Sequence, residues 1–422
     1  MERYSEYKDS GVQWLGVIPK HWTQFQFRKF FKIKKVIAGK EGFDVLAITQ
    51  QGIKVKDITS NEGQIAANYS GYQIVNPSDF AMNHMDLITG YIDISKFHGV
   101  TSPDYRVFTN ISKEADSKYY LYIFQLCYKR KIFFGLGQGV ANKGRWRLPA
   151  AQLNKFCLPL PPLSEQHSIV SYLDDKCGKI DKMLEGKQKQ IELLAEMKQR
   201  IIADAVTRGL NPNVKLKATN IPWLPEIPEH WKIKRGKNLF NKEQRPIEEG
   251  DDIVTCFRDG EVTLRKNRRT TGFTEATDYS HYQHICKGDL VIHQMDAFAG
   301  ASGVSDSDGM GTPVLSVCTA KVEGLNHYYY AYILRLMGKN NFILSLYRGI
   351  RERSSDFRFE TFAKQYLPVP PASEQKEIVE FINERSSKID TLASKLYQEI
   401  ESIKEYKQRL ISDVVTGQIK IL

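Results

Sequence analysis

The chain repeats itself at half its own length. The stretch WLGVIPKHW at residues 14–22 returns as WLPEIPEHW at residues 223–231, with both tryptophans and the Ile-Pro-x-His core retained. A longer pair of segments begins at Leu158 and at Leu367, again 209 residues apart, and 22 of its 50 positions match without a gap. Such a repeat indicates tandem copies of one folding unit, so we expect two related halves.

Between the repeated segments the two halves diverge. Residues 32–156 and 242–366 share only patches, such as MNHMD (82–86) against IHQMD (292–296). Both inserts carry short β-rich runs (FDVLAIT, YRVFT, GDLVIH) and an aromatic stretch that predicts a helix at 118–128 and at 327–337. The tyrosines of these helices, Tyr119, Tyr120, Tyr328 and Tyr329, could stack on bases, but their helical spacing favours core positions. The fold class is therefore α+β, with one scaffold carrying two unlike inserts.

Each insert is followed by a segment that predicts helices. A Pro-Pro pair forces an extended entry, a serine can cap the first turn, and a glutamate there suits the helix dipole. We expect a short helix and then a longer one in each half. The residues that set these expectations are Ser164, Glu165, Asp175 and Lys179 in the first half, and Ser373, Glu374, Glu384 and Lys388 in the second.

The longer helices carry a heptad-like apolar seam, although Lys187 interrupts the first one. A helix from about Cys177 to Arg208 would be roughly 48 Å long. Because it carries the chain away from the first domain, the second helix must run back to pair with it. This predicts an antiparallel, coiled-coil-like pair between two globular domains, which a pseudo-two-fold axis would relate. The alternative is that each helix packs only on its own domain. The seam residues are Ile180, Leu184, Ile191, Leu194 and Ile201, and Ile389, Leu392, Leu396, Ile403 and Leu410, joined by Met183, Met197, Ile400, Tyr406 and Val414.

The composition favours a polyanionic partner. Lys and Arg outnumber Asp and Glu by 60 to 49, for a net charge of +11, although a merely basic surface would look the same. The six cysteines form no C-x-x-C pair, the N-terminus has no apolar signal region, and no apolar run reaches the roughly 20 residues of a membrane helix. We expect a cytoplasmic protein that does not enter a membrane.

Polar loops of the inserts are the candidate DNA-reading groups. Glutamine can pair with adenine edges and arginine with guanine, while lysine contacts phosphates. The basic run RDGEVTLRKNRRT is equally compatible with a solvated loop. The candidates are Gln50, Gln51, Lys54, Lys56, Asn83, His84, Lys143, Arg145 and Arg147 in the first insert, and Arg258, Arg265, Lys266, Arg268, Arg269, Gln294, Arg351 and Arg353 in the second.

The whole plan resembles the specificity subunit of type I restriction–modification systems. The resemblance rests on YKDSGVQWLGVIPKHW, on the LP-x-PP-x-SEQ turns, on the KQR-x-I-x-D helices and on two variable regions. It implies target recognition domains at 1–157 and 223–366, conserved helical regions at 158–208 and 367–422, and a linker at 209–222. It further implies a non-catalytic subunit that reads a bipartite double-stranded DNA target and docks two methyltransferase subunits. S-adenosylmethionine and ATP would belong to the partners, the latter to restriction subunits, and no cofactor to this chain.

Two other classes stay open at this point. FGLGQG at 134–139 imitates the glycine loop of a methyltransferase, but no NPPY-like motif follows it, and no phosphate-binding G-x-x-x-x-G-K-[ST] is present. The histidines His21, His84, His230 and His293 show no metal-ligand spacing. A helical scaffold that never contacts DNA would explain the repeat, but it explains poorly why two unlike basic inserts are held on it.

Overall fold

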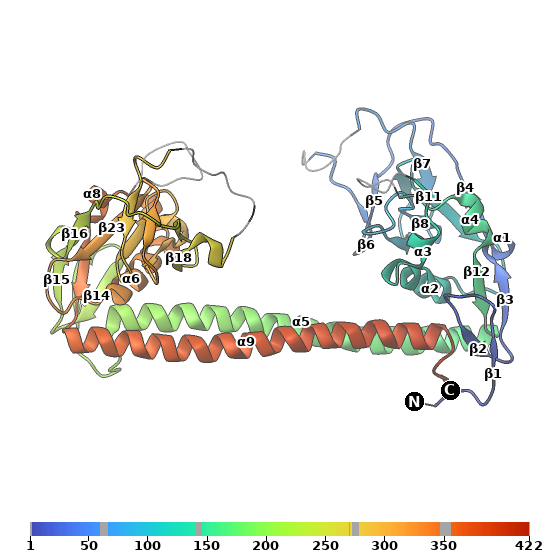
Figure 1. Ribbon diagram of the computed structural model, residues 1–422. Helices are drawn as coiled ribbons and strands as arrows, with labels where there is room; N and C mark the ends of the chain where they lie inside the picture. Colours follow the sequence, from blue (N-terminus) through green and yellow to red (C-terminus); the bar gives the residue numbers. More distant parts are fainter. Residues whose placement is uncertain are drawn as a thin grey trace. The chain divides into compact units, whose positions relative to one another are not determined.

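The computed structural model describes residues 2–59, 66–139, 146–269, 271, 278–346 and 356–421. The chain divides into two compact units. Unit 1 is Met1–Gln188 with Tyr397–Leu422, and unit 2 is Lys189–Leu396. Unit 1 therefore combines the first domain with the first part of α5 (Leu163–Arg208) and the last part of α9 (Ala372–Val415). Unit 2 combines the second domain with the last part of α5 and the first part of α9 (Figure 1).

The domain of unit 1 is built around a four-stranded antiparallel sheet of order β4-β11-β8-β9, with the helix α2 packed beside it. Two-stranded ladders β1-β2, β3-β12, β5-β6 and β7-β10 surround it. The elements are β1 Tyr7–Asp9, β2 Val17–Pro19, β3 Thr23–Gln26, α1 Phe27–Phe30, β4 Phe31–Lys34, β5 Leu46–Thr49, β6 Gly52–Val55, β7 Gln73–Val75, β8 Phe80–Met82, β9 Ile92–Ile94, β10 Gly99–Thr101, β11 Arg106–Asn110, α2 Ser117–Lys129, α3 Ile132–Gly135, α4 Ala150–Lys155 and β12 Cys157–Leu160.

The domain of unit 2 repeats this plan with the sheet β16-β23-β20-β21 and the helix α6. Its ladders are β13-β14, β15-β24, β17-β18 and β19-β22. The elements are β13 Leu216–Ile221, β14 Leu224–Pro228, β15 Lys232–Arg235, η1 Gly236–Asn238, β16 Phe240–Glu243, β17 Val254–Cys256, β18 Val262–Leu264, η2 Arg265–Asn267, β19 Gln283–Ile285, β20 Leu290–His293, η3 Ala297–Ala299, β21 Ser302–Val304, β22 Gly309–Gly311, β23 Leu315–Ala320, α6 His327–Lys339, α7 Phe342–Ser345, α8 Phe359–Phe362 and β24 Tyr366–Val369.

These elements confirm the predicted strands and aromatic helices. Tyr119, Tyr120 and Tyr329 are fully buried, as their spacing predicts, whereas Tyr328 is 52% exposed, so its prediction as a core residue was wrong. In unit 2 the buried pair is Tyr329 and Tyr330, because the second copy of the repeat has one more residue than the first before this helix. The predicted linker 209–222 contains strand β13, which pairs with β14.

The two long helices are unbroken. α5 runs Leu163–Arg208 and α9 runs Ala372–Val415, so α5 with its 46 residues is about 69 Å long. The expected division into a short and a longer helix was wrong. The apolar positions Leu173, Cys177 and Ile180 continue the seam in phase through the predicted break, and their burial outweighs the roughly 1 kcal/mol cost of Gly178 in a helix.

The helices also begin earlier than predicted. α5 starts directly after Pro162, whose carbonyl accepts the N–H groups of Glu165 and Gln166, so Ser164 lies inside the first turn and is not its N-cap. In the same way α9 starts after Pro371, and Ser373 is a helical residue.

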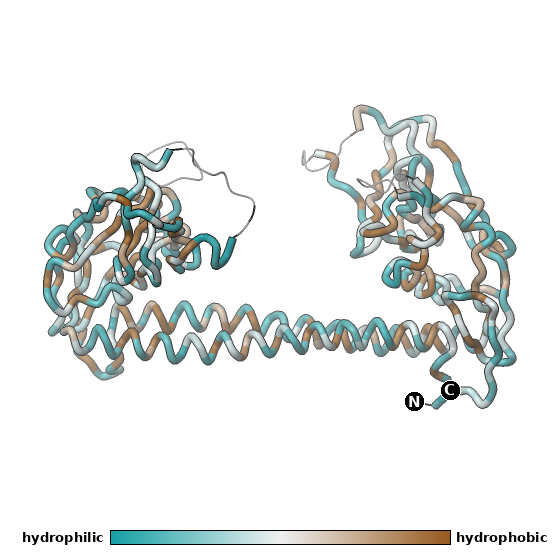
Figure 2. Tube along the Cα trace, viewed as in Figure 1, coloured by the Kyte–Doolittle hydropathy of each residue, from teal (hydrophilic) through white to brown (hydrophobic). Residues whose placement is uncertain are grey.

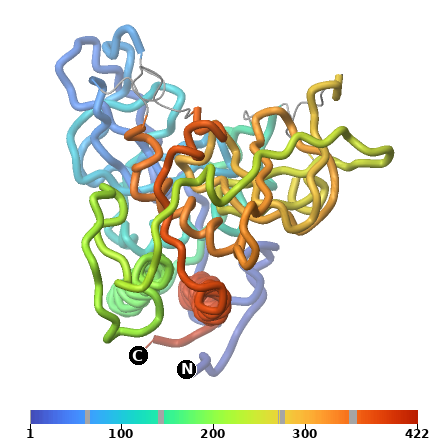
Figure 3. Tube along the Cα trace, turned by 90° about the vertical axis from the view of Figure 1, so that its left-hand side faces the viewer, coloured from blue at the N-terminus to red at the C-terminus, as the bar shows by residue number. Residues whose placement is uncertain are grey.

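Within each unit the two helices run antiparallel, as predicted (Figure 1), and Figure 3 shows them side by side and nearly end-on. In unit 1, Asp181 pairs with Lys407 and Lys187 pairs with Glu399, so the contact moves backward along α9 as it advances along α5. In unit 2, Lys198 reaches Asp390 at 2.7 Å. The pairs Lys407–Asp181 and Lys198–Asp390 occupy equivalent positions of the repeat, which places the same contact once in each unit.

Four of the predicted seam residues, Met183, Met197, Leu392 and Tyr406, are exposed. The others are buried or half-buried, and the polar and apolar residues alternate along both helices (Figure 2). Leu392 is 50% exposed because it precedes the seam position Ala393 by one residue and therefore lies on the flank of the helix. Lys187 fills a seam position and extends its ammonium group to Glu399.

Candidate nucleic-acid interface

The repeated His-Trp dipeptide anchors each domain to the start of its own long helix. In unit 1 the buried Trp22 donates its indole N–H to Glu165 at 2.7 Å, and Glu165 also contacts His21 at 3.1 Å and the hydroxyl of Tyr4 at 2.7 Å. In unit 2, Trp231 and His230 contact Glu374 at 3.0 and 2.8 Å. The feature that the sequence repeats is therefore the joint between domain and helix.

The same joint holds the end of the other long helix. Gly417, with φ +75°, lies so close to Trp22 and Pro19 that a Cβ would approach the proline ring within 2.5 Å. Gly209, with φ +73°, is placed in the same way beside Trp231. Each domain thus contacts the beginning of one long helix and the end of the other.

Buried tyrosines also bind the ends of the long helices. Tyr119 donates its hydroxyl to the carbonyl of Val415 at 2.8 Å, and Tyr329 donates to the carbonyl of Val206 at 2.7 Å. Both carbonyls belong to the last turns of the long helices, which have no intrahelical partner for such groups. The aromatic helices α2 and α6 are therefore structural, and they fix the domain on the helical pair.

The first candidate reading group in unit 1 lies on the β5–β6 hairpin. Gln50 and Gln51 form its exposed turn, and Gln50 donates to the carbonyl of Thr89 in the loop that follows β8. Lys54, on β6, is exposed and donates to Gln51 at 2.5 Å, while Lys56 follows β6 and is half-buried. The predicted glutamines therefore form the two-residue turn of the hairpin and are exposed.

The second group in unit 1 lies at the end of β8. The His84 carbonyl accepts the N–H of Leu148 at 3.0 Å, which joins the end of β8 to the segment that precedes α4. The side chain of Asn83, next to His84 in the chain, is half-buried. Burial, with the nearby charges of Arg106 and Arg147, lowers the pKa of His84 to about 4, which makes it a neutral hydrogen-bonding group near neutral pH.

In unit 2 the same two places carry different chemistry. Arg258 occupies the turn of the β17–β18 hairpin, is 65% exposed and pairs with Asp296 at 2.9 Å in the loop after β20. The Gln294 carbonyl accepts the N–H of Phe357 at 2.9 Å, which repeats the His84–Leu148 contact. Its side-chain amide reaches the hydroxyl of Ser316 and the carbonyl of Pro313, each at 3.3 Å. We call the hairpin turn and the loop after the neighbouring strand the recognition rim of each domain. It comprises residues 50–51 and 83–91 in unit 1, and residues 257–261 and 294–301 in unit 2.

The basic run after β18 is partly neutralised within unit 2. Arg268 pairs with Asp259 and Glu261 and lies 4.2 Å over the ring of Phe257. Lys266 pairs with Asp252. Arg265 begins the 3-10 helix η2, and Arg269 donates to the carbonyl of Thr271. The carboxylates that hold Arg268 and Lys266 make this run less suited to phosphates than its sequence suggests.

Four predicted residues, Lys143, Arg145, Arg351 and Arg353, lie outside the described residues.

Two cations near the rims were missed by sequence reasoning. Arg106 is only 8% exposed, donates to the carbonyl of Leu148 at 2.9 Å, and burial lowers its pKa to about 10. Arg335, whose pKa burial also lowers, lies under the β17–β18 turn. An arginine inside an otherwise apolar strand or helix was the available signal for both.

The glycine run at 134–139 does not form a methyltransferase-like loop. Gly135 ends the short helix α3, and Gln138 forms a bridge with Arg147, so the run follows a helix and leads into an isolated bridge. A cofactor loop of that kind follows a strand and opens a helix.

In the described part of the chain, no helix is both long and apolar enough to span a bilayer.

Fold and rims together define a tandem recognition protein, in which one α+β domain occurs twice with equivalent but chemically different rims. A model of the type I restriction modification DNA specificity domain matches residues 20–193 and again 228–402. The chain therefore belongs to the family of type I restriction–modification specificity subunits, which are the non-catalytic members of these systems.

Individual relatives agree with this assignment. The chain is 23% identical over 316 residues to a putative MjaX specificity subunit of Methanocaldococcus jannaschii, covering 72% of this chain and 68% of that one. It is 22% identical over 298 residues to the EcoBI specificity subunit of Escherichia coli, covering 64% and 60%.

Solved structures match the fold over nearly the whole chain. One, described as bearing on complex assembly and conformational transition of a type I R-M system, has a TM-score of 0.66 at 14% identity, with 95% and 99% coverage. The HsdS subunit of Thermoanaerobacter tengcongensis has a TM-score of 0.52 at 12% identity, with 95% and 98% coverage.

Proposed function

We propose that the rim of each domain reads one half of a bipartite double-stranded DNA target. The observation that carries this proposal is that the two rims occupy equivalent places on one scaffold but present different hydrogen-bonding groups. Gln50 and Gln51 offer paired donors and acceptors of the kind that fit adenine, whereas Arg258 offers the bidentate donor that fits guanine. Two equivalent but unlike readers suit a target whose halves differ in sequence.

The long helices suit a second role. We propose that they set the distance between the half-sites and dock two methyltransferase subunits, one for each copy of the repeat. S-adenosylmethionine would then be bound by these partners, and ATP by restriction subunits where they join. The net charge of +11 supports association with DNA, and the six free cysteines suit a reducing cytoplasm.

The test exchanges one recognition domain. The chain is reconstituted with its methyltransferase subunits, methylated positions are mapped on genomic DNA, and residues 242–366 are then replaced by the corresponding insert of another family member. We expect one half-site to change while the other half and the gap stay the same. A change in both half-sites would contradict modular reading.

The same preparation separates the other two classes. The chain alone should bind DNA without methylating it, and turnover by the chain alone would favour a methyltransferase. Absence of DNA binding at low salt, with and without methyltransferase subunits, would favour a purely helical scaffold.

A further inference from the structure

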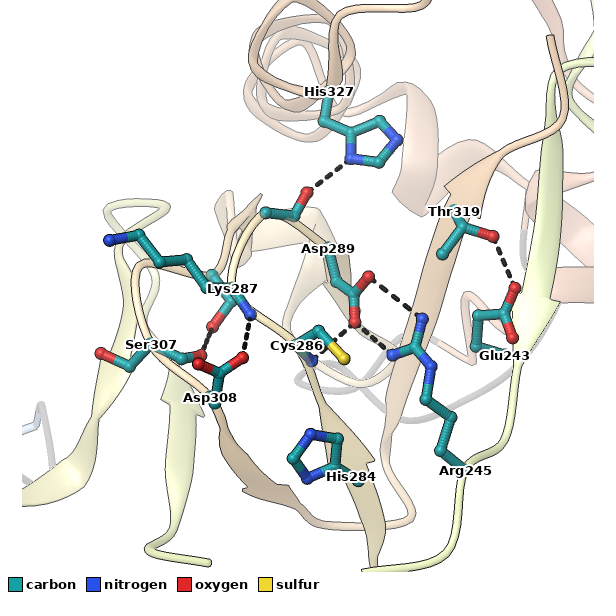
Figure 4. A network of polar contacts seen from close by, with 12 residues as sticks. Glu243, Arg245, His284, Cys286, Lys287, Asp289, Ser307, Asp308, Thr319 and His327 are labelled. Atoms are coloured by element: carbon teal, nitrogen blue, oxygen red, sulfur yellow. Dashed lines mark hydrogen bonds and ion pairs between the residues drawn. The ribbon is translucent and has the colours of Figure 1, made fainter. Parts of the chain in front are cut away.

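Three metal-ligating side chains meet at one end of the β19–β22 ladder in unit 2. The donor atoms of His284, Cys286 and Asp308 all lie within 4.8 Å of one another (Figure 4). β19 pairs with β22 so that Ile285 faces Gly309, which continues to place Cys286 opposite Asp308. His284 precedes Cys286 by two residues and therefore shares its face of the ladder.

The imidazole of His284 is already oriented for a metal. Its Nδ1 lies 3.1 and 2.9 Å from the two carboxylate oxygens of Asp251, and both side chains are at most 9% exposed. A carboxylate on Nδ1 holds the proton there and leaves the lone pair on Nε2, which is the arrangement found behind histidine ligands of metals. A further carboxylate oxygen, Glu248 Oε1, lies 4.0 Å from Nε2.

The other two donors are held but remain accessible. The backbone N–H of Cys286 is fixed by Asp289 at 2.8 Å, and the carboxylate of Asp308 accepts the N–H of Lys287 at 2.8 Å. Cys286 is half-buried and Asp308 is exposed. Donors around a tetrahedral zinc lie about 3.5 Å apart, as bond lengths near 2.0–2.3 Å imply. The donor atoms here lie within 4.8 Å of one another, so metal binding would draw the exposed Asp308 side chain inward.

The equivalent place in unit 1 lacks this donor set. There β7 pairs with β10, and the corresponding residues are Ile74, Asn76 and His98, of which His98 and Asn76 form a hydrogen bond of 3.0 Å. The repeated fold does not require metal donors at this position. The His-Cys-Asp set is therefore a property of the second domain.

We propose that His284, Cys286 and Asp308 bind a divalent transition-metal ion of the zinc class, with Glu248 as a fourth ligand. Nitrogen, thiolate and carboxylate donors together favour zinc over magnesium or calcium, which take oxygen ligands. When the Cys286 sulfur binds the metal, its S–H proton passes to solvent and no redox change occurs.

The bound ion would connect two segments of the domain. His284 lies on β19, and Cys286 and Asp308 lie directly beyond the paired ends of β19 and β22. Glu248 and its neighbour Asp251 lie on the segment that leads into β17. The β17–β18 hairpin carries Arg258 of the recognition rim. Metal binding would therefore stiffen the support of the second rim and leave the first unchanged.

Cobalt titration of the untagged full-length chain, freed of metal with a chelator, tests this proposal. We expect one Co²⁺ per chain, a thiolate-to-cobalt charge-transfer band, d–d bands of tetrahedral intensity, and displacement of both by Zn²⁺. Amide hydrogen exchange should slow in β19 and β22 on Zn²⁺ addition and stay unchanged in β7 and β10.

Variants identify the ligands. Cys286→Ser should abolish the charge-transfer band, whereas Cys157→Ser, at the other half-buried thiol, should leave it intact. Asp308→Asn changes an exposed side chain and should weaken binding at least tenfold without affecting folding, and Asp251→Asn should weaken it by roughly 10- to 100-fold through loss of the histidine's orientation.

Two results would overturn the proposal. One is a wild-type chain that shows no charge-transfer band with Co²⁺. The other is a band that survives both Cys286→Ser and Asp308→Asn, which would locate the metal elsewhere.

Discussion

Replacing Glu374 by alanine tests the joint between domain and helix in unit 2. Glu374 accepts the indole N–H of Trp231 at 3.0 Å and contacts His230 at 2.8 Å. Trp231 is 1% exposed, so the substitution leaves a buried donor without its charged acceptor, which costs about 2–3 kcal/mol. The contact with His230 adds little, because that side chain is 49% exposed. A cost of this size raises the local opening constant roughly 30- to 140-fold.

The equivalent change in unit 1 should cost more. Glu165 accepts from the hydroxyl of Tyr4 as well as from Trp22, each at 2.7 Å, in addition to its contact with His21. One more hydrogen bond to a carboxylate is worth roughly 1–2 kcal/mol. Glu165→Ala should therefore destabilise unit 1 more than Glu374→Ala destabilises unit 2.

Hydrogen exchange of each variant, resolved by mass spectrometry, measures both effects. Peptides covering β15 and β24 report on unit 2, and peptides covering β3 and β12 report on unit 1. Glu374→Gln is the control, because its amide oxygen can still accept from Trp231, and we expect it to cost no more than about 1 kcal/mol. The reasoning is refuted if Glu374→Gln is as damaging as Glu374→Ala, or if exchange in β15 and β24 changes less than threefold.

Three further outcomes are expected. The folded-state pKa of His84, about 4, lies below its usual 6.5, so the unfolded chain binds the extra proton as pH falls between these values. The stability of unit 1 should therefore be complete above pH 6.5 and fall toward pH 4, and His84→Gln should flatten this part of the pH profile of urea unfolding. Inserting one heptad after Gln188 and one after Gln398 keeps the seam in phase and lengthens each helix by about 10.5 Å, so the methylated half-sites should move apart by about 3 base pairs, and an unchanged gap would refute the spacer role. Arg258→Ala should relax one position of one half-site in methylation mapping, at about 1–3 kcal/mol of discrimination, and equal weakening on all sequences would instead identify a phosphate contact.

The recognition rims show how far sequence reasoning could reach. The hairpin residues Gln50, Gln51 and Arg258 could be found, because polar residues at a turn between β-rich runs are exposed wherever the strands pack. The buried Arg106 could not be connected to His84, because β11 and the end of β8 meet only through sheet pairing. Arg268 was overvalued, since the carboxylates of Asp259 and Glu261 that neutralise it become its neighbours only when the hairpin folds.

The sequence by itself determined the duplicated architecture and the antiparallel helices, because both follow from periodicity along the chain. A 209-residue repeat requires two like units, and apolar residues in heptads require a partner helix. Only the tertiary structure decided that each helix is unbroken, that Leu392 lies outside the seam, and that His284, Cys286 and Asp308 meet. These features depend on helix phase and strand register, which are fixed by packing between segments far apart in the chain.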